Sequence, residues 1–217
     1  MLETLIKGSY MMIPLMICSV LALAVLLDRA WAFYQYRKID NRALRARVLE
    51  LLSADKVDEA ARLCANTPGP VSAVLLAGLQ SLAKHRHLAD SVQSLTAVME
   101  KAMDDYSQHA LSAVGKRLNV LSTVGSAAPL LGMTGTVTGM IRAFTKMVEA
   151  GVDAKAVAGG ISEALITTAA GLIIALFAVI PFNIFTSISD RIELEIEEAG
   201  SELLDFVATR IGHDRPA

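Results

Sequence analysis

Three long apolar segments constrain the fold of this chain more than any other feature. Windows free of charged residues run through residues 8–27, 118–141 and 164–189. A helix needs roughly 20 apolar residues to cross the hydrocarbon core of a bilayer. The chain is 53% hydrophobic and only 19% charged, a composition unlike that of an ordinary soluble domain. The sequence therefore predicts a membrane protein with three transmembrane helices.

The charges that flank the first apolar segment predict its orientation. Only Lys7 precedes it, opposed by Glu3, whereas Arg29, Arg37, Lys38, Arg42, Arg45 and Arg47 follow it. A cleaved signal peptide carries its basic residues before the apolar run, so we do not interpret Ala30-Trp31-Ala32 as a cleavage site. The positive-inside rule places the basic flank in the cytoplasm and the N-terminus on the opposite side.

This orientation divides the chain into seven segments. We predict an outer N-terminus (1–9), a first transmembrane helix (10–28), a cytoplasmic helical loop (29–117), a second transmembrane helix (118–141), an outer link (142–160), a third transmembrane helix (161–188) and a cytoplasmic helical tail (189–217).

The polar segments are predicted to be helical. Within the loop, the cluster Asn66-Thr67-Pro68-Gly69-Pro70 is a clear turn between helices. Proline is absent between Ala89 and Pro129, so one helix is expected to continue from the loop into the second span. In the tail, apolar residues recur at spacings of four and three: Ile184, Ile188, Ile192, Ile196, Ala199, Leu203 and Phe206. That stripe needs a packing partner. The two cysteines, Cys18 and Cys64, are expected to be free thiols.

Small residues form a regular seam along each of the last two spans. In the second span they are Gly125, Ala128, Gly132, Gly135 and Gly139, and in the third Ala164, Thr168, Gly171, Ala175 and Ala178. Small residues let helix backbones approach closely inside a membrane. Both helices must therefore be tightly packed, and we expect an oligomer to bury the two seams.

One carboxylate interrupts this apolar region. Glu163 is the only ionisable side chain between Lys155 and Asp190. Ionisable residues in membrane spans usually mark ion paths. A helix-start acid stabilised by the helix dipole is an equally good explanation, because Glu163 lies in the first turn of its predicted helix. Thr167 shares its face, and Thr168 lies on the adjacent seam, so this surface can hold an acid beside hydroxyls.

The sequence does not indicate an enzyme or a cofactor. The glycines between Gly132 and Gly139 lack the lysine of a phosphate-binding loop. His85-x-His87 has no nearby cysteine or carboxylate cluster to complete a metal site. We therefore predict no catalytic residues, no metal and no nucleic-acid partner.

Two motifs resemble those of a known family. GMTGTVTGMIRAF (132–144) and AGGISEALITTAAGL (158–172) are similar to the paired signatures of the MotA/TolQ/ExbB proton-channel family, in its ExbB and TolQ branch. The resemblance implies an all-α inner-membrane homopentamer with long cytoplasmic helical extensions and a periplasmic N-terminus. Its second and third spans would surround a central pore. The pore would hold the single-span helices of an ExbD- or TolR-like partner with a membrane aspartate, and proton passage would drive a TonB- or TolA-like protein.

The same resemblance assigns the candidate site. Glu163 matches the glutamate of the family's third-span signature, and Thr136 and Thr168 match its pore threonines. Pore or packing roles are both open for Thr167, Gly135, Gly139 and Pro129. The chain departs from the usual pattern at Thr138, Met133-Thr134 and Gly159. A passive membrane scaffold for a single-span partner is the alternative function, and the transported cargo stays open.

Overall fold

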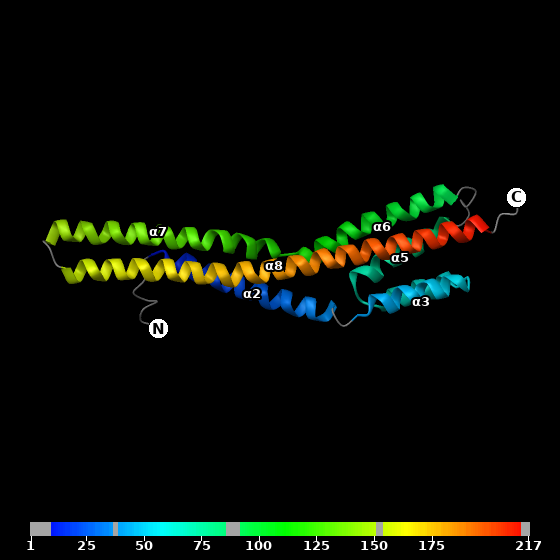
Figure 1. Cartoon of the computed structure of the whole chain (residues 1–217), viewed down its shortest axis with the longest axis horizontal. Helices are drawn as coiled ribbons and strands as arrows, with labels where there is room; N and C mark the ends of the chain where they lie inside the picture. Colours follow the sequence, from blue (N-terminus) through cyan, green and yellow to red (C-terminus); the bar gives the residue numbers. More distant parts are fainter. Residues whose placement is uncertain (1–9, 37–38, 86–91, 151–153, 214–217) are drawn as a thin grey trace. The chain divides into compact units, whose positions relative to one another are not determined.

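The computed structural model describes residues 10–36, 39–85, 92–150 and 154–213, and these residues form helices joined by short turns. The helices are α2 (Met12–Tyr36), α3 (Asn41–Ser53), α4 (Val57–Asn66), α5 (Pro70–His85), α6 (Val92–Gly115), α7 (Leu118–Ala150) and α8 (Ala154–His213) (Figure 1). Segments of α2, α7 and α8 are long and apolar enough to cross a membrane. The described residues are thus all helical, with three helices that can span a membrane, as the sequence predicts.

The chain divides into two compact units. The first contains the chain up to Trp31 together with Arg117–Phe185, and we call it the membrane unit. The second contains Ala32–Lys116 and the chain from Thr186 onward, and we call it the polar unit. Helix α8 contributes its first part to the membrane unit and the remainder to the polar unit.

In the membrane unit, α7 and the first part of α8 run side by side (Figure 1). Their small-residue seams face each other, with Ala128, Ala164 and Ala178 fully or almost fully buried. We expected an oligomer to bury these seams, and that expectation is wrong, because each seam buries the other within one chain. A regular row of small residues on one helix face indicates tight packing, but it does not identify the helix that packs there.

The outer surface of the membrane unit is strongly apolar. Exposed large hydrophobic residues on its three helices include Ile13, Ile17, Val20, Leu23, Leu130, Met133, Leu172, Leu176 and Phe177. An apolar surface this extensive is unfavourable in water and marks contact with lipid or protein. It fits helices that span a bilayer.

In the polar unit, the apolar stripe of α8 packs against helices of the same chain. Of the predicted stripe, Ile192, Ile196, Ala199 and Leu203 are buried, and Val207 is buried beside them. The other predicted members are less buried: Ile188 and Phe206 are half-buried, and Ile184 is exposed. A Cβ atom on Gly78 of α5 would lie 2.6 Å from Met103 Sδ of α6 and 3.0 Å from a methyl group of Leu203. Helices α5, α6 and α8 therefore meet at this glycine, and the stripe finds its partner in the predicted helical loop.

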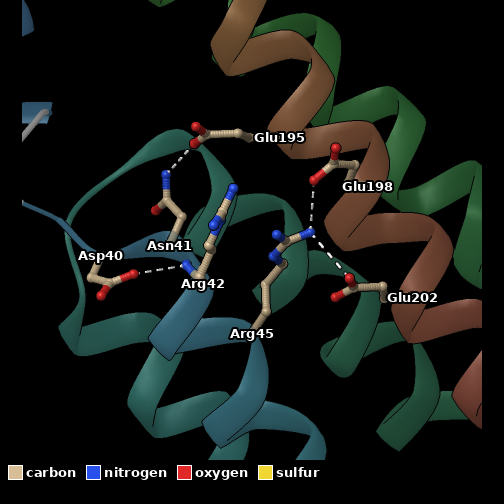
Figure 2. A network of polar contacts seen from close by, with 7 residues as sticks. All are labelled: Asp40, Asn41, Arg42, Arg45, Glu195, Glu198 and Glu202. Atoms are coloured by element: carbon tan, nitrogen blue, oxygen red, sulfur yellow. Dashed lines mark hydrogen bonds and ion pairs between the residues drawn. The ribbon is translucent and has the colours of Figure 1, made fainter.

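Polar contacts join α3 to α8 in the same unit (Figure 2). Arg45 Nη1 lies 3.1 Å from a carboxylate oxygen of Glu198 and 3.3 Å from one of Glu202. Asn41 Nδ2 donates a hydrogen bond of 2.6 Å to Glu195. Asp40 caps α3 by accepting hydrogen bonds from the backbone of the first turn. These contacts fix the start of α3 against α8.

The expected continuous helix from the loop into the second span is not formed. Helix α6 ends at Gly115 and α7 begins at Leu118, and Arg117 between them has a φ of 68°. The interruption follows Gly115, but the left-handed conformation is adopted by Arg117 and not by that glycine. Arg117 Nη1 also donates a hydrogen bond of 3.2 Å to Asp28 of α2, which ties the start of α7 to α2.

Both cysteines are free thiols, as predicted. Cys64 is buried in α4, with 2% of its surface exposed. Desolvation by this burial raises the pKa of the Cys64 thiol to about 11. The thiol is therefore neutral across the physiological pH range.

Candidate functional site

The seam between α7 and α8 is the best-defined feature of the membrane unit. A Cβ atom on Gly139 would lie 2.8 Å from Ala164 Cβ, and one on Gly160 would lie 2.8 Å from Ala143 Cβ. On Gly171, a Cβ atom would lie only 2.6 Å from the carbonyl oxygen of Ala128. A carbonyl oxygen belongs to the backbone and cannot move aside easily. The two helices are therefore closer than side chains at these glycines would permit.

One edge of the seam carries both family-matched threonines. Thr168 Oγ1 donates a hydrogen bond of 2.9 Å across the seam to the carbonyl oxygen of Gly132. Thr136 Oγ1 donates one of 2.6 Å to the carbonyl oxygen of Met133 on its own helix. Both side chains are half-buried. Thr136 follows Gly132 by four residues, and Thr168 follows Ala164 by four. Each threonine is therefore rotated by about 40° around its helix from that small residue. Because the helices are antiparallel, both threonines fall on the same side, which we call the threonine edge.

The opposite edge carries Glu163 and Thr167, and we call it the acid edge. Thr167 has no exposed surface, and its Oγ1 donates a hydrogen bond of 3.0 Å to the backbone carbonyl of Glu163. A Cβ atom on Gly135 would lie 2.4 Å from Thr167 Cγ2 and 3.5 Å from Met11 Cβ. The turn before α2 therefore reaches this edge. The Glu163 side chain is half-buried.

The candidate residues thus lie in two separate places. Five residues separate Glu163 from Thr168, which corresponds to about 140° around the helix. The predicted surface that combines the acid with Thr168 is not formed within one chain. Thr167, Gly135 and Gly139 are buried in the seam.

Pro129 is half-buried in the interior of α7. Proline has no N–H group to donate, so the carbonyl of Gly125 lacks its usual helical donor at this turn. The helix nevertheless continues from Leu118 to Ala150. At this turn α7 packs closely on α8, since a Cβ atom on Gly125 would lie 2.4 Å from Val179 Cγ2.

The described residues contain no group of three or more His, Cys, Asp or Glu that could hold a metal ion. His85 Nδ1 lies 3.0 Å from the carbonyl oxygen of Ser81 on its own helix. His87, the second residue of the His-x-His pair, lies outside the described residues.

Comparison with known proteins decides the family. Residues 66–198 match the model of the MotA/TolQ/ExbB proton channel family. The chain belongs to this family. The matched region contains Thr136, Glu163 and Thr168, so both edges of the seam lie within the family's characteristic segment. The family is one of proton channels and not of enzymes.

Relatives bearing ExbB names extend over most of the chain. A putative biopolymer transport protein ExbB-like 1 from Synechocystis is 35% identical over 94% of this chain and 77% of its own length. ExbB-like 3 from the same organism is 30% identical over 96% of this chain and 95% of its own length. The biopolymer transport protein ExbB of Xanthomonas campestris is 32% identical over 64% of this chain and 58% of its own length. These names support the ExbB and TolQ branch of the family.

A further contact at the acid edge of this family member escaped the sequence analysis. The guanidinium carbon of Arg142 lies 5.7 Å from the centre of the Tyr10 ring, within range of a cation–π interaction. Tyr10 precedes α2, and Arg142 is in α7. No local pattern predicts a contact between residues so far apart in the chain. Together with the contact between Met11 and Gly135, it holds the start of α2 beside the acid edge.

Proposed function

We propose that this protein is a proton-conducting subunit of a bacterial inner-membrane complex that converts the proton motive force into work on a TonB- or TolA-like partner. Membership of the proton channel family and the ExbB names of its relatives support the proposal. The observation that carries it is Glu163, a half-buried acid beside a rigid helix seam and the only ionisable residue between Lys155 and Asp190. Such residues in membrane spans usually serve ion movement.

The proposed topology follows the flanking charges. The N-terminus (1–9) and the link (142–160) lie in the periplasm, and the loop (29–117) and tail (189–217) lie in the cytoplasm. Transmembrane helices at 10–28, 118–141 and 161–188 connect them. Arg29 and Arg117 then lie at the cytoplasmic surface, as the positive-inside rule requires.

The threonine edge is the surface that we assign to a shared pore. The start of α2 lies against the acid edge, whereas Thr136 and Thr168 stay half-exposed on the other edge. In a homopentamer, five threonine edges would surround a central pore holding the helices of an ExbD- or TolR-like partner with a membrane aspartate. The partner aspartate would exchange protons with water held at the threonine hydroxyls.

Glu163 has a distinct role in this scheme. It lies at the outer end of α8 and on the edge away from the threonines. We assign it as a protonatable group whose change of charge alters the contact of α8 with α2, while the pore threonines face the partner helix.

Proton flux in the assembled complex tests this function. The complex would be copurified with its single-span partner, reconstituted into liposomes and driven by a potassium diffusion potential. Glu163→Gln and Glu163→Ala are expected to lower the flux at least tenfold, and Glu163→Asp to retain part of it. Ser162→Ala is the matched control, because Ser162 is the exposed neighbour of Glu163. Full flux in an assembled Glu163→Ala complex would refute the role of this residue.

A passive membrane scaffold is the second candidate. It is favoured by the hydroxyls of Thr136, Thr167 and Thr168, which all donate to backbone carbonyls within this chain. A scaffold would hold its single-span partner without using the proton gradient. Activity that survives treatment of cells with an uncoupler would support the scaffold, and loss of activity would support the channel.

A further inference from the structure

A groove with a volume of about 510 Å³ lies between α6 and α8 in the polar unit. Its floor is apolar and includes the buried side chains of Val74, Met103 and Ile196. We call it the α6–α8 groove. Concave sites of roughly 300 to 1,000 Å³ with apolar walls are where proteins bind other molecules. The groove belongs to the polar unit and is therefore distinct from the seam that carries Glu163.

Gly200 belongs to the same floor, and packing within the chain does not require a glycine there. A Cβ atom on Gly200 would lie 3.9 Å from Met103 Sδ and Cε, which is ordinary van der Waals contact. On Gly78, by contrast, a Cβ atom would lie 2.6 Å from Met103 Sδ. Glycine in the interior of a helix is destabilising relative to alanine. Glycine at position 200 therefore weakens α8 locally and leaves room in the groove for a side chain from another molecule.

Acidic side chains stand on both sides of the groove. Glu100 and Asp104 are on α6, Glu197 is on α8, and all three are exposed. Within the chain segments that the structure describes, none of these three carboxylates forms an ion pair. Among the described residues that line the groove, Lys101 alone is basic. The groove therefore has a net negative charge, and its three carboxylates can pair with cations from outside the chain.

An apolar floor between acidic sides is complementary to a basic amphipathic helix. Such a helix lays its apolar side chains into a groove and holds its polar side chains at the rim. Glu100 and Asp104 are one helical turn apart, so they match two cations at the same spacing on a partner helix. Opposite charges on the two surfaces also speed their encounter and disfavour acidic partners.

We propose that the α6–α8 groove binds a basic amphipathic helix of a partner protein, with an apolar side chain over Gly200 and cations against the three carboxylates. A second copy of this chain is a poorer match, because two of its exposed cations, Arg47 and Lys56, already pair with carboxylates of their own chain. The proposed topology places the groove, and hence the partner segment, in the cytoplasm. The binding itself depends on neither Glu163 nor proton flux, so it is tested apart from the proposed function.

A synthetic peptide tests the groove in the full-length protein. The protein is placed in nanodiscs of zwitterionic phosphatidylcholine, and empty nanodiscs measure binding of the peptide to lipid alone. The probe is a fluorescent peptide of leucine and lysine, about 14 residues long, with its leucines on one helical face. Fluorescence anisotropy is expected to show saturable binding of this peptide. A peptide with glutamate in place of every lysine is expected not to bind.

Neutralising the carboxylates tests the electrostatic part of the proposal. One triple variant removes the charges of the groove: Glu100→Gln, Asp104→Asn and Glu197→Gln. A matched triple variant removes three exposed carboxylates around α3 and α4: Glu50→Gln, Asp58→Asn and Glu59→Gln. An exposed ion pair changes affinity by about two- to threefold, so the groove variant should bind the lysine peptide about tenfold more weakly. The matched variant has the same net charge and should lose less than about twofold.

Filling the groove tests the apolar part without a change of charge. Gly200→Leu places a side chain where the partner's apolar residue is proposed to lie, and it should weaken peptide binding about tenfold. Gly159→Leu is the matched control, because no atom lies within 4 Å of a Cβ atom built on Gly159 in the membrane unit. Binding to Gly159→Leu should equal binding to the wild type. If Gly200→Leu does not assemble, the two triple variants decide the question by themselves.

Four results would overturn the proposal. They are no saturable binding of the lysine peptide, equal weakening in the two triple variants, unchanged binding by Gly200→Leu, and a smaller number of copies in the Gly200→Leu complex. Equal weakening would show general attraction between a basic peptide and an acidic protein. Native mass spectrometry counts the copies, and a loss of copies would show that a second copy of this chain occupies the groove.

Discussion

Thr168 Oγ1 and the carbonyl oxygen of Gly132 are 2.9 Å apart and form a hydrogen bond between α8 and α7. The bond crosses the seam where a Cβ atom on Gly132 would lie 3.1 Å from Thr168 Cα. A backbone acceptor is available here only because glycine allows the helices to approach so closely. The family-matched threonine therefore fixes the helix pair and also places its side chain at the threonine edge.

Thr168→Val separates these two roles, because valine keeps the shape of threonine and loses the hydroxyl. Loss of this interhelical hydrogen bond is expected to lower stability by about 0.6 kcal/mol, and by no more than about 2 kcal/mol. Thr168→Ser retains the hydroxyl and should keep most of the proton flux. Thermal unfolding of the solubilised complex measures the first effect, and liposome flux measures the second. Equal flux in the two variants would contradict a pore role for this hydroxyl.

The contact between Gly135 and Thr167 predicts a compensating pair of substitutions. Gly135→Ala places a methyl group 2.4 Å from Thr167 Cγ2 and should destabilise the protein by about 1 to 3 kcal/mol, as overpacking does. Thr167→Ser removes that methyl group and keeps the hydroxyl that donates to Glu163, so the double variant should recover most of the loss. Unfolding midpoints of the single and double variants measure the coupling.

Gly159→Ala is the matched control for this pair. No atom lies within 4 Å of a Cβ atom built on Gly159, which is an exposed residue in α8. Alanine at such a position should be neutral or stabilise the helix by up to about 1 kcal/mol. If Gly159→Ala destabilises as much as Gly135→Ala, close packing of the seam is not the cause.

The small-residue seams were predictable from the sequence, because small residues recur there at helical spacings of three and four. Such a row in a membrane-spanning helix indicates close helix packing. Their partner was not predictable, since a spacing of three and four is satisfied equally by a neighbouring subunit or by the same chain. The break at Arg117 was missed although Gly115, the last residue of α6, marks it, because one glycine does not by itself end a helix and the residue in the left-handed conformation is Arg117. The five-residue spacing of Glu163 and Thr168 already places them about 140° apart around α8. Which elements face each of the two edges required the structure.

Arg45 is expected to contribute to the stability of the polar unit. Its side chain is only 13% exposed and contacts both Glu198 and Glu202 (Figure 2). Arg45→Ala should cost about 1 kcal/mol or slightly more, which includes the lost packing of its alkyl chain. Added salt should weaken the electrostatic part, because the two carboxylates are largely exposed. Urea unfolding at low and high salt measures both effects.

Arg47→Ala serves as the comparison for Arg45→Ala. Arg47 forms an ion pair with Glu50 on the same exposed helix face, and both side chains are more than half exposed. Such a pair should contribute no more than about 0.5 kcal/mol. If Arg45→Ala and Arg47→Ala lower the free energy of unfolding equally at low salt, the contacts of Arg45 with α8 contribute no more stability than an ordinary surface ion pair.

Burial of Cys64 predicts a loss of stability in alkaline solution. Burial raises the pKa of the folded thiol from 9.0 to about 11, so the unfolded chain releases this proton at a lower pH than the folded protein. Between about pH 9 and pH 11 the folded state binds more protons, and stability therefore falls as the pH rises, by at most about 1.4 kcal/mol per pH unit. Below pH 9 this group gives no pH dependence.

Cys64→Ala isolates this contribution from the lysines and tyrosines that titrate in the same range. Its unfolding free energy should be lower than that of the wild type near pH 8, because alanine leaves a small cavity. The difference between the two proteins should then narrow from pH 9 to pH 11, since only the wild type has the thiol. Denaturant unfolding at half-unit pH steps measures this difference. Curves that stay parallel to pH 11 would show that the folded thiol ionises as readily as the unfolded one.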